Sequence, residues 1–182
     1  MDKHDETKYI FAQAIKELIK NRPLDKITVT DIVIKAGMTR QTFYRYFMDK
    51  YDLVNWYFEK LVLKSFRQMG NGCSLYEALC LKFEFIQNEH SFFKEAFKSN
   101  DCNNLINYDF SCIYSFYKKI IERNLGHQVD KDIDFLLQMY CKGSIDMTVD
   151  WILNDMPISI KEIVILLIEA LPKKLEPFIL NT

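Results

Sequence analysis

A short segment of the chain carries four long polar side chains along one arc of a predicted helix. At roughly 100° per residue this arc lies opposite Phe43 and Phe47, so one face of the helix is aromatic and the other polar. Arginine and glutamine form paired hydrogen bonds with guanine and adenine edges in a major groove. An ordinary amphipathic helix with a solvated face is the alternative. The four side chains belong to Arg40, Gln41, Tyr44 and Arg45.

The residues around this arc predict two short helices joined by a tight turn. Thr28 and Asp31 have the spacing of a capping box, in which a hydroxyl and a carboxylate satisfy unpaired amides at a helix start. Gly37 stands where a left-handed residue would end that helix, and Thr39 is placed to cap the next one. A helix, a short turn with glycine and a second helix form a helix-turn-helix. This geometry favours a base-reading role for the polar arc.

Lys50 follows Asp49 at the predicted start of a long helix. A cation is unfavourable there, because the helix dipole places partial positive charge at that end. A phosphate group against the same helix end removes the penalty, since helix N-termini and lysine both bind anions. A solvated lysine with a small energetic cost is the alternative, and the position alone leaves both interpretations open.

The run Thr28–Leu53 resembles the DNA-binding signature of the TetR family of bacterial transcriptional regulators. The agreement covers the N-terminal third of the chain and includes the pair Ala36-Gly37, the triplet Thr42-Phe43-Tyr44, Phe47 and Lys50. Further along, the run N-E-H-S-F-F-K-E-A-F resembles the branch of that family that includes activators of dihydroxyacetone kinase operons. This second match is short, and it implies no particular effector or partner.

For individual residues the family resemblance implies three kinds of DNA contact. Thr28 and Thr30 match residues that lie at the start of the first helix of the motif and approach the DNA backbone, and Lys50 matches one that touches a phosphate. Further residues match side chains that face the groove, and of these Arg40 and Gln41 vary within the family, so no target base carries over. The groove-facing residues are Thr39, Arg40, Gln41, Thr42, Tyr44 and Arg45.

Composition and charge describe a packed protein with a mildly basic N-terminal part. Of the 182 residues, 49% are hydrophobic, and the formal net charge is −1. Met1–Lys50 carries ten Lys and Arg residues against seven Asp and Glu, whereas the remainder carries fourteen against eighteen. A basic N-terminal part on an acidic body suits local contact with phosphate.

Metal, redox and membrane functions find little support in the sequence. The five cysteines are scattered without a C-x-x-C pair and the three histidines stand apart, so we expect no metal site and no cofactor. A redox sensor built on one thiol stays open as an alternative. Met1–Lys8 is polar and unlike a signal peptide, and the longest apolar run, Ile163–Ile168, is too short to span a bilayer. We therefore expect a soluble cytoplasmic protein.

Apolar residues at helical spacing predict an all-α fold in two domains. Residues 1–50 form the expected three-helix DNA-binding domain, and residues 51–182 form a helical domain for ligand binding and dimerisation. A helix from Asp49 to about Met69 links them, and Gly70–Gly72 is the clearest break. Six further helices are expected at Thr7–Asn21, Ser74–Asn88, Ser91–Lys98, Leu105–Asn124, Asp130–Asn154 and Ser159–Leu171.

Burial requirements suggest how three of these helices pack. The first helix is expected to cover the two helices of the motif and to bury Phe43 and Phe47. The aromatic residues crowded into Phe83–Tyr117 either line a pocket for an aromatic or lipophilic effector or fill a helical core, and the core is favoured. Ser159–Leu171 is apolar on nearly every side, so a two-fold dimer through the last two long helices would bury it. Members of the TetR family dimerise in this way.

The sequence therefore predicts a homodimeric transcriptional regulator that binds double-stranded DNA. Its operator would be roughly palindromic, with half-sites about one helical turn apart, and an effector bound in the C-terminal domain would control it. Control by a partner protein in place of a small ligand is the alternative. A helical enzyme is a third hypothesis, but no nucleophile with a base, no carboxylate pair and no metal set has suitable spacing.

Overall fold

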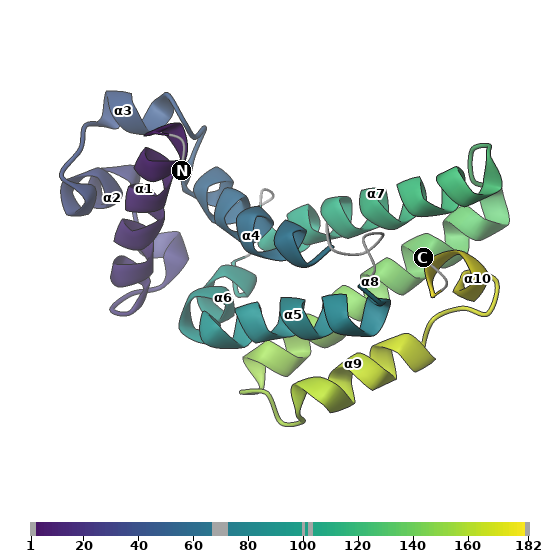
Figure 1. The fold of residues 1–182 in the computed structure, drawn as a ribbon. Helices are drawn as coiled ribbons and strands as arrows, with labels where there is room; N and C mark the ends of the chain where they lie inside the picture. Colours follow the sequence, from purple (N-terminus) through teal and green to yellow (C-terminus); the bar gives the residue numbers. More distant parts are fainter. Residues whose placement is uncertain (1–2, 67–72, 100, 102–103, 181–182) are drawn as a thin grey trace. The chain divides into compact units, whose positions relative to one another are not determined.

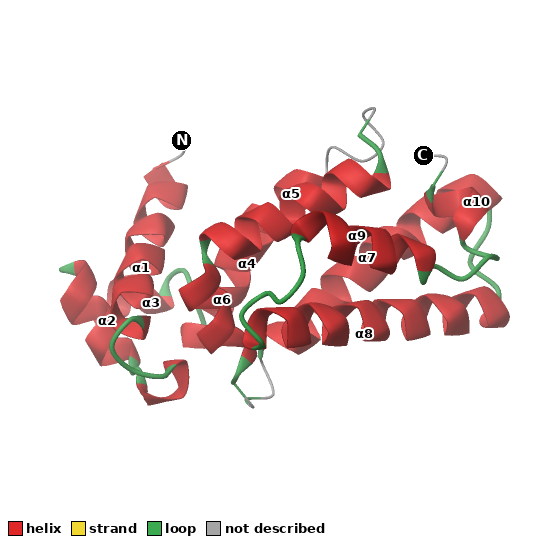
Figure 2. Cartoon of the chain, turned by 90° about the horizontal axis from the view of Figure 1, so that it is seen from below, coloured by secondary structure: helices red, strands yellow, loops and turns green. Residues whose placement is uncertain are grey.

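The computed structural model describes residues 3–66, 73–99, 101 and 104–180, which are mainly helical (Figures 1 and 2). The expected all-α class is confirmed. The elements are α1 (Lys3–Ile19), the 3-10 helix η1 (Leu24–Lys26), α2 (Val29–Ala36), α3 (Arg40–Tyr44), α4 (Lys50–Phe66), α5 (Leu75–Asn88), α6 (His90–Phe97), α7 (Leu105–Leu125), α8 (Lys131–Leu153), α9 (Ile160–Glu169) and α10 (Glu176–Ile179).

The chain divides into two compact units, which are described separately. The head unit consists of Met1–Leu61 and Glu89–Leu105, and the body unit consists of Val62–Asn88 and Ile106–Thr182. The head therefore contains α6 in addition to the N-terminal helices. The division expected from the sequence, with a DNA-binding domain at residues 1–50 and a helical domain at residues 51–182, stays a prediction.

The core of the head forms where α1 covers α2 and α3. Phe11 of α1 meets Phe43 edge to face with the ring centroids 5.2 Å apart, and it meets Phe47 at 6.4 Å. Phe43 and Phe47 are 0% and 2% exposed. Full burial of each such ring stabilises the fold by roughly 1.5–3 kcal/mol. The expectation that the first helix buries both rings is confirmed.

Helix α6 packs into the same unit through three phenylalanines. Phe92 meets Tyr57 with centroids 5.3 Å apart, while Phe93 and Phe97 meet Phe58 at 5.8 and 6.5 Å. All five rings are buried. These phenylalanines belong to the crowded aromatic segment of the sequence, and their role is to fill the core of the head.

In the body unit, α5 lies alongside α9 (Figure 1). Phe83 of α5 meets Trp151 of α8 edge to face at 5.2 Å. Trp151 also donates its indole N–H to the carbonyl of Ile158 at 2.8 Å, which closes the turn between α8 and α9. The hydroxyl of Tyr140 donates to the carbonyl of Leu167 at 2.9 Å and joins the same two helices. These two hydrogen bonds attach α8 to the segment just before α9 and to the C-terminal part of α9.

Several boundaries differ from those expected. Helix α1 begins at Lys3, before the expected Thr7, with Asp5 and Glu6 in its first turn, where acidic side chains favour the helix dipole. The short elements η1 and α10 were not predicted, and α6 begins one residue earlier than expected. The predicted break at Gly70–Gly72 lies outside the described residues.

Candidate nucleic-acid interface

The first helix of the motif starts at the predicted capping box. Thr28 Oγ1 accepts from the amide of Asp31 at 3.2 Å, and Asp31 Oδ2 accepts from the amide of Thr28 at 2.8 Å. Arg22 lies 3.0 Å from the second oxygen of the carboxylate. The pKa of Asp31 is lowered to about 2, mainly by hydrogen bonds from the Thr28 hydroxyl and amide and to a smaller extent by the hydrogen bond from Arg22. The carboxylate is therefore ionised over the physiological range.

The turn between the two helices ends α2 in a Schellman motif. Gly37 has φ 64° and ψ 31°, a left-handed conformation that glycine adopts at little cost. Its amide donates to the carbonyl of Ile34 at 3.2 Å, and the amide of Met38 donates to that of Val33 at 2.9 Å. These are the two bonds that define the motif. The glycine predicted to end the helix does so.

Thr39 then caps α3, as predicted. Its hydroxyl accepts from the amide of Thr42 at 3.1 Å and lies 2.9 Å from the Thr42 hydroxyl. Helix α3 has five residues, which is too few for a stable helix in isolation. It is held between the Thr39 cap and Phe43, whose side chain is fully buried.

The polar arc of α3 is exposed. Phe43 points into the core, whereas Arg40, Gln41, Tyr44 and Arg45 are exposed and Thr42 is half-buried. The guanidinium of Arg40 lies 5.8 Å from the centre of the Tyr44 ring, within the range of a cation–π contact. Thr30 on α2 is also exposed. The structure thus brings the predicted groove-facing side chains together, while their contact with DNA stays a prediction.

Lys50 lies at the start of α4, and its ammonium group is directed into the head. Nζ donates to the carbonyls of Leu24 at 2.8 Å, Asp25 at 2.9 Å and Ile27 at 2.8 Å. Burial lowers the pKa of Lys50, although Asp25 acts in the opposite direction. In this arrangement the lysine fastens η1, which leads into α2. This contact was not anticipated from the sequence.

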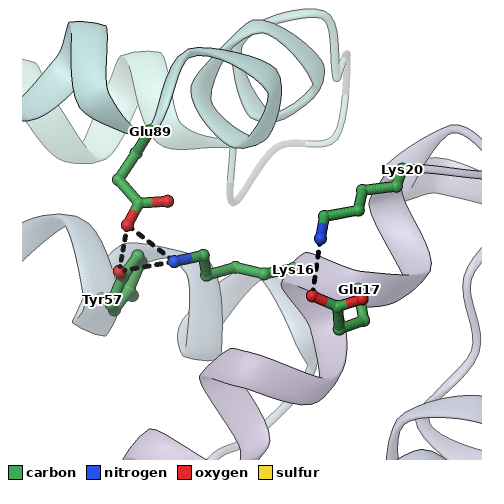
Figure 3. A network of polar contacts seen from close by, with 5 residues as sticks. All are labelled: Lys16, Glu17, Lys20, Tyr57 and Glu89. Carbon is green, nitrogen blue, oxygen red and sulfur yellow. Dashed lines mark hydrogen bonds and ion pairs between the residues drawn. The ribbon is translucent and has the colours of Figure 1, made fainter.

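Two further polar clusters in the head were missed by sequence reasoning. In one, Asp25 Oδ1 accepts from the hydroxyls of Ser99 at 2.7 Å and Tyr51 at 3.0 Å. In the other, Glu89 accepts from Lys16 and Tyr57 (Figure 3). Lys16 and Glu89 are 73 positions apart in the chain. No local pattern signals such a pairing, because the partners meet only after the helices pack.

Three findings on the described residues concern metal ions, thiols and membranes. No group of three or more His, Cys, Asp or Glu side chains suitable for a metal ion occurs among them. The cysteines that the structure describes form no disulfide, and burial raises the pKa of Cys141 to about 12, which makes that thiol unreactive. In the described part of the chain no helix has the length and apolarity needed to cross a membrane.

Comparisons with known proteins match both parts of the chain. A family model described as "Bacterial regulatory proteins, tetR family" matches residues 12–56. A second, described as "Transcriptional regulator C-terminal region", matches residues 74–173. A curated relative from Lactococcus lactis, the HTH-type dhaKLM operon transcriptional activator DhaS, is 32% identical over 95 residues. That alignment covers 50% of this chain and 49% of the relative.

Two solved structures are similar in fold. The dihydroxyacetone kinase operon activator DhaS is 23% identical, with a TM-score of 0.63 over 94% of this chain and 97% of that one. FadR of Thermus thermophilus, a transcriptional repressor solved in complex with lauroyl-CoA, is 17% identical, with a TM-score of 0.59 over 90% of this chain and 92% of that one. At these identities the likeness concerns the fold alone.

Proposed function

The chain belongs to the TetR family of transcriptional regulators, and from that premise we propose that it is a homodimer that binds a palindromic operator through α3. The observation that carries the proposal is the exposed polar arc of α3 above a fully buried Phe43. Arg40 and Gln41 would read base edges in the major groove. Tyr44, Arg45, Thr39 and Thr42 would face the same groove.

We propose that the DNA backbone is held by residues on either side of α3. Thr28 and Thr30 lie at the start of α2, where amides near a helix N-terminus favour phosphate. Lys50 is the proposed phosphate contact at the start of α4. Because its three donors bond to carbonyls of residues 24–27, contact with a phosphate requires the exchange of one of these bonds.

Dimerisation through α8 and α9 is supported by the apolar side chains that these helices leave exposed. Ile163, Val164 and Leu167 of α9 are buried, yet Ile165 and Leu166 are 46% and 55% exposed. On α8, Phe135, Met139 and Met147 are 67%, 53% and 54% exposed, and with Gly143 they fall at four-residue intervals on one stripe. A second copy of the chain covering this surface would bury it in an isologous interface.

In such a dimer each subunit would present one α3 to a half-site, with the half-sites about one helical turn apart. We further propose control by an effector bound in the body unit. The FadR structure solved with lauroyl-CoA is a precedent within the fold. Control by a partner protein is the alternative. The proposed role on DNA implies a cytoplasmic location and no enzymatic activity of its own.

The direct test is a band-shift titration on the DNA upstream of the protein's own gene. We expect the unaltered chain to bind, and the variant that combines Arg40→Ala with Tyr44→Ala to lose at least about tenfold in affinity, because a good base contact contributes roughly 1–3 kcal/mol. Lys119→Ala on α7, an exposed position in the body, is the matched control. Equal affinity of the double variant and the unaltered chain would refute the assignment of the interface.

A further inference from the structure

Helix α6 is a part of the head although the chain reaches it from the body. The residues on either side of Glu89–Leu105, ending at Asn88 and resuming at Ile106, belong to the body unit. Within the head, α6 contributes Phe92, Phe93 and Phe97 to the core. The head therefore depends on a segment that enters from α5 and leaves toward α7. Polar contacts at each end of this segment determine how it is held.

At the start of α6, Glu89 forms a three-membered cluster with Lys16 of α1 and Tyr57 of α4 (Figure 3). Its Oε1 accepts from Lys16 Nζ at 2.6 Å and from the Tyr57 hydroxyl at 3.0 Å, and Lys16 Nζ also lies 3.2 Å from that hydroxyl. Burial, together with the Glu89 carboxylate, raises the pKa of Tyr57, which keeps its hydroxyl a donor. One carboxylate thus joins three helices.

The side chain of Glu89 does not cap the helix that it begins. It is the N-cap residue of α6, yet its side chain forms no capping hydrogen bond. The carboxylate is directed across to α1 and α4, where the side chains of Lys16 and Glu89 are 18% and 24% exposed. By contrast, Lys20 and Glu17, also drawn in Figure 3, lie 2.7 Å apart at the end of α1, where both side chains are exposed.

Beyond the C-terminal end of α6, Ser99 reaches the turn that leads into the recognition motif. Ser99 is 3% exposed, and its hydroxyl donates to Asp25 Oδ1 at 2.7 Å. The same oxygen accepts from the Tyr51 hydroxyl at 3.0 Å, while the backbone carbonyl of Asp25 accepts from Lys50 at 2.9 Å. Asp25 belongs to η1, immediately before the capping box of α2. A single hydrogen bond therefore connects Ser99 to η1, the element that precedes the helix-turn-helix.

We propose that Glu89 and Ser99 are positioning residues for DNA binding. Glu89 fastens the start of α6 to α1 and α4, and Ser99 fastens the segment after α6 to η1, so the arrangement of α2 and α3 depends on α6 being held at both ends. This inference rests on the proposed function.

Conservative variants test the proposal in the full-length chain. Tyr57→Phe removes one hydroxyl and keeps the ring against Phe92, Glu89→Gln removes the charge, and Ser99→Ala removes the buried hydroxyl. Affinity for the upstream DNA is measured by fluorescence anisotropy, at a temperature where circular dichroism shows every variant folded. We expect each variant to bind roughly threefold to tenfold more weakly, since each removes one contact of a network that holds the helices of the motif.

Two further comparisons separate positioning from a general loss of contacts. The exchanged pair Lys16→Glu with Glu89→Lys restores the ion pair with reversed charges, and we expect it to regain the affinity that Glu89→Gln loses. Glu17→Gln and Ser111→Ala are the controls, because the Glu17 carboxylate pairs with Lys20, three positions along the chain, and the Ser111 hydroxyl bonds within α7, to the carbonyl of Asn107. Affinities of Glu89→Gln and Ser99→Ala that equal those of these controls would overturn the proposal.

Hydrogen exchange distinguishes a failure of this inference from a failure of the proposed function. If the unaltered chain binds none of the DNA, the proposed function fails, and the amides of α2 and α3 still report positioning. We expect them to exchange faster in Glu89→Gln and Ser99→Ala than in Glu17→Gln and Ser111→Ala. Equal exchange in all four variants would overturn the positioning role by itself.

Discussion

Among single residues, Lys50 has two roles, one structural and one proposed for DNA binding. It supplies hydrogen bonds to the carbonyls of Leu24, Asp25 and Ile27, and it carries a positive charge beside the proposed DNA-binding surface. The carbonyls of a short 3-10 helix need donors from outside the helix, because such an element satisfies few of its own. The lysine thus stabilises the entry to α2 before any DNA is bound.

Replacing Lys50 with alanine separates these two roles. We expect the variant to bind all DNA sequences more weakly to a similar degree, and the slope of log K against log salt to fall by about 0.9 per subunit because one phosphate contact is lost. Its melting temperature should also fall, since the three carbonyls each lose the hydrogen bond from Lys50. The measurement is a set of band-shift titrations between low and moderate salt. Weaker binding with an unchanged salt slope would leave only the structural role.

Asp31 offers a pH-dependent prediction at the same scale. Its pKa is lowered from 3.8 to about 2 by hydrogen bonds from Thr28 and by Arg22. A depressed carboxyl pKa contributes stability that is fully present above the unfolded value and is lost as pH falls through the folded value. We therefore expect the capping box to weaken between about pH 4 and pH 2. A carboxyl titration followed by NMR checks this, and a midpoint at the ordinary value would contradict it.

The matched variant for this titration is Thr28→Val, which removes the hydroxyl that contributes most to the shift. The titration midpoint of Asp31 should then move upward.

At the scale of elements, the turn between α2 and α3 depends on the conformation of one residue. A Cβ at Gly37 would meet no atom within 4 Å, so a substitution there is opposed only by the positive φ. We expect Gly37→Ala to destabilise the protein by about 1–2 kcal/mol, measured by urea unfolding. Gly37→Asn should cost less, because asparagine tolerates the left-handed region better. An alanine variant as stable as the unaltered chain would refute the stated cause.

The helices that could be predicted are those whose signals are local. Thr28 with Asp31, Gly37 and Thr39 marked the bounds of α2 and the start of α3, because caps and left-handed residues act over three or four positions. The element η1 carries no periodic pattern, since it is a three-residue turn, and the lysine that bonds to its carbonyls lies 25 and 26 positions further along the chain.

In the proposed DNA-binding site, too, only the features with local signals could be predicted. The exposed arc of α3 follows from a period of 3.6 residues, whereas the clusters around Asp25 and Glu89 follow from packing. Ser99 and Asp25 are 74 positions apart, and a serine and an aspartate at that distance give no signal in a single sequence. The assignment of α6 to the head was missed for the same reason: its phenylalanines suit any helical core.

For the whole molecule, the central prediction concerns assembly. Met139→Lys with Gly143→Lys places two charges on the exposed stripe of α8, and because a Cβ at Gly143 meets nothing within 4 Å, the single chain should accommodate the change. We expect sedimentation to show a monomer, and operator affinity to fall by at least about tenfold because two linked half-sites no longer act together. Persistence of the dimer would place the interface elsewhere.

Ser115→Lys on α7 is the control for assembly, because it adds a charge at an exposed position on a helix outside the proposed interface. It should leave both the sedimentation coefficient and DNA affinity unchanged. A double variant that remains dimeric but binds DNA poorly would separate assembly from recognition, and it would contradict the proposed interface.

The exposure of Arg40 and Gln41 has a consequence for how this protein can diverge. The fold of α3 depends on the Thr39 cap and the buried Phe43, and neither of the two exposed side chains contributes to the core. Exposed substitutions away from caps and cores typically change stability by less than about 0.5 kcal/mol. Under the proposed recognition of DNA by Arg40 and Gln41, duplicated copies of the gene would be able to change their target sequence at these positions with little loss of stability. The same property makes the pair a suitable starting point for engineering regulators that do not cross-react.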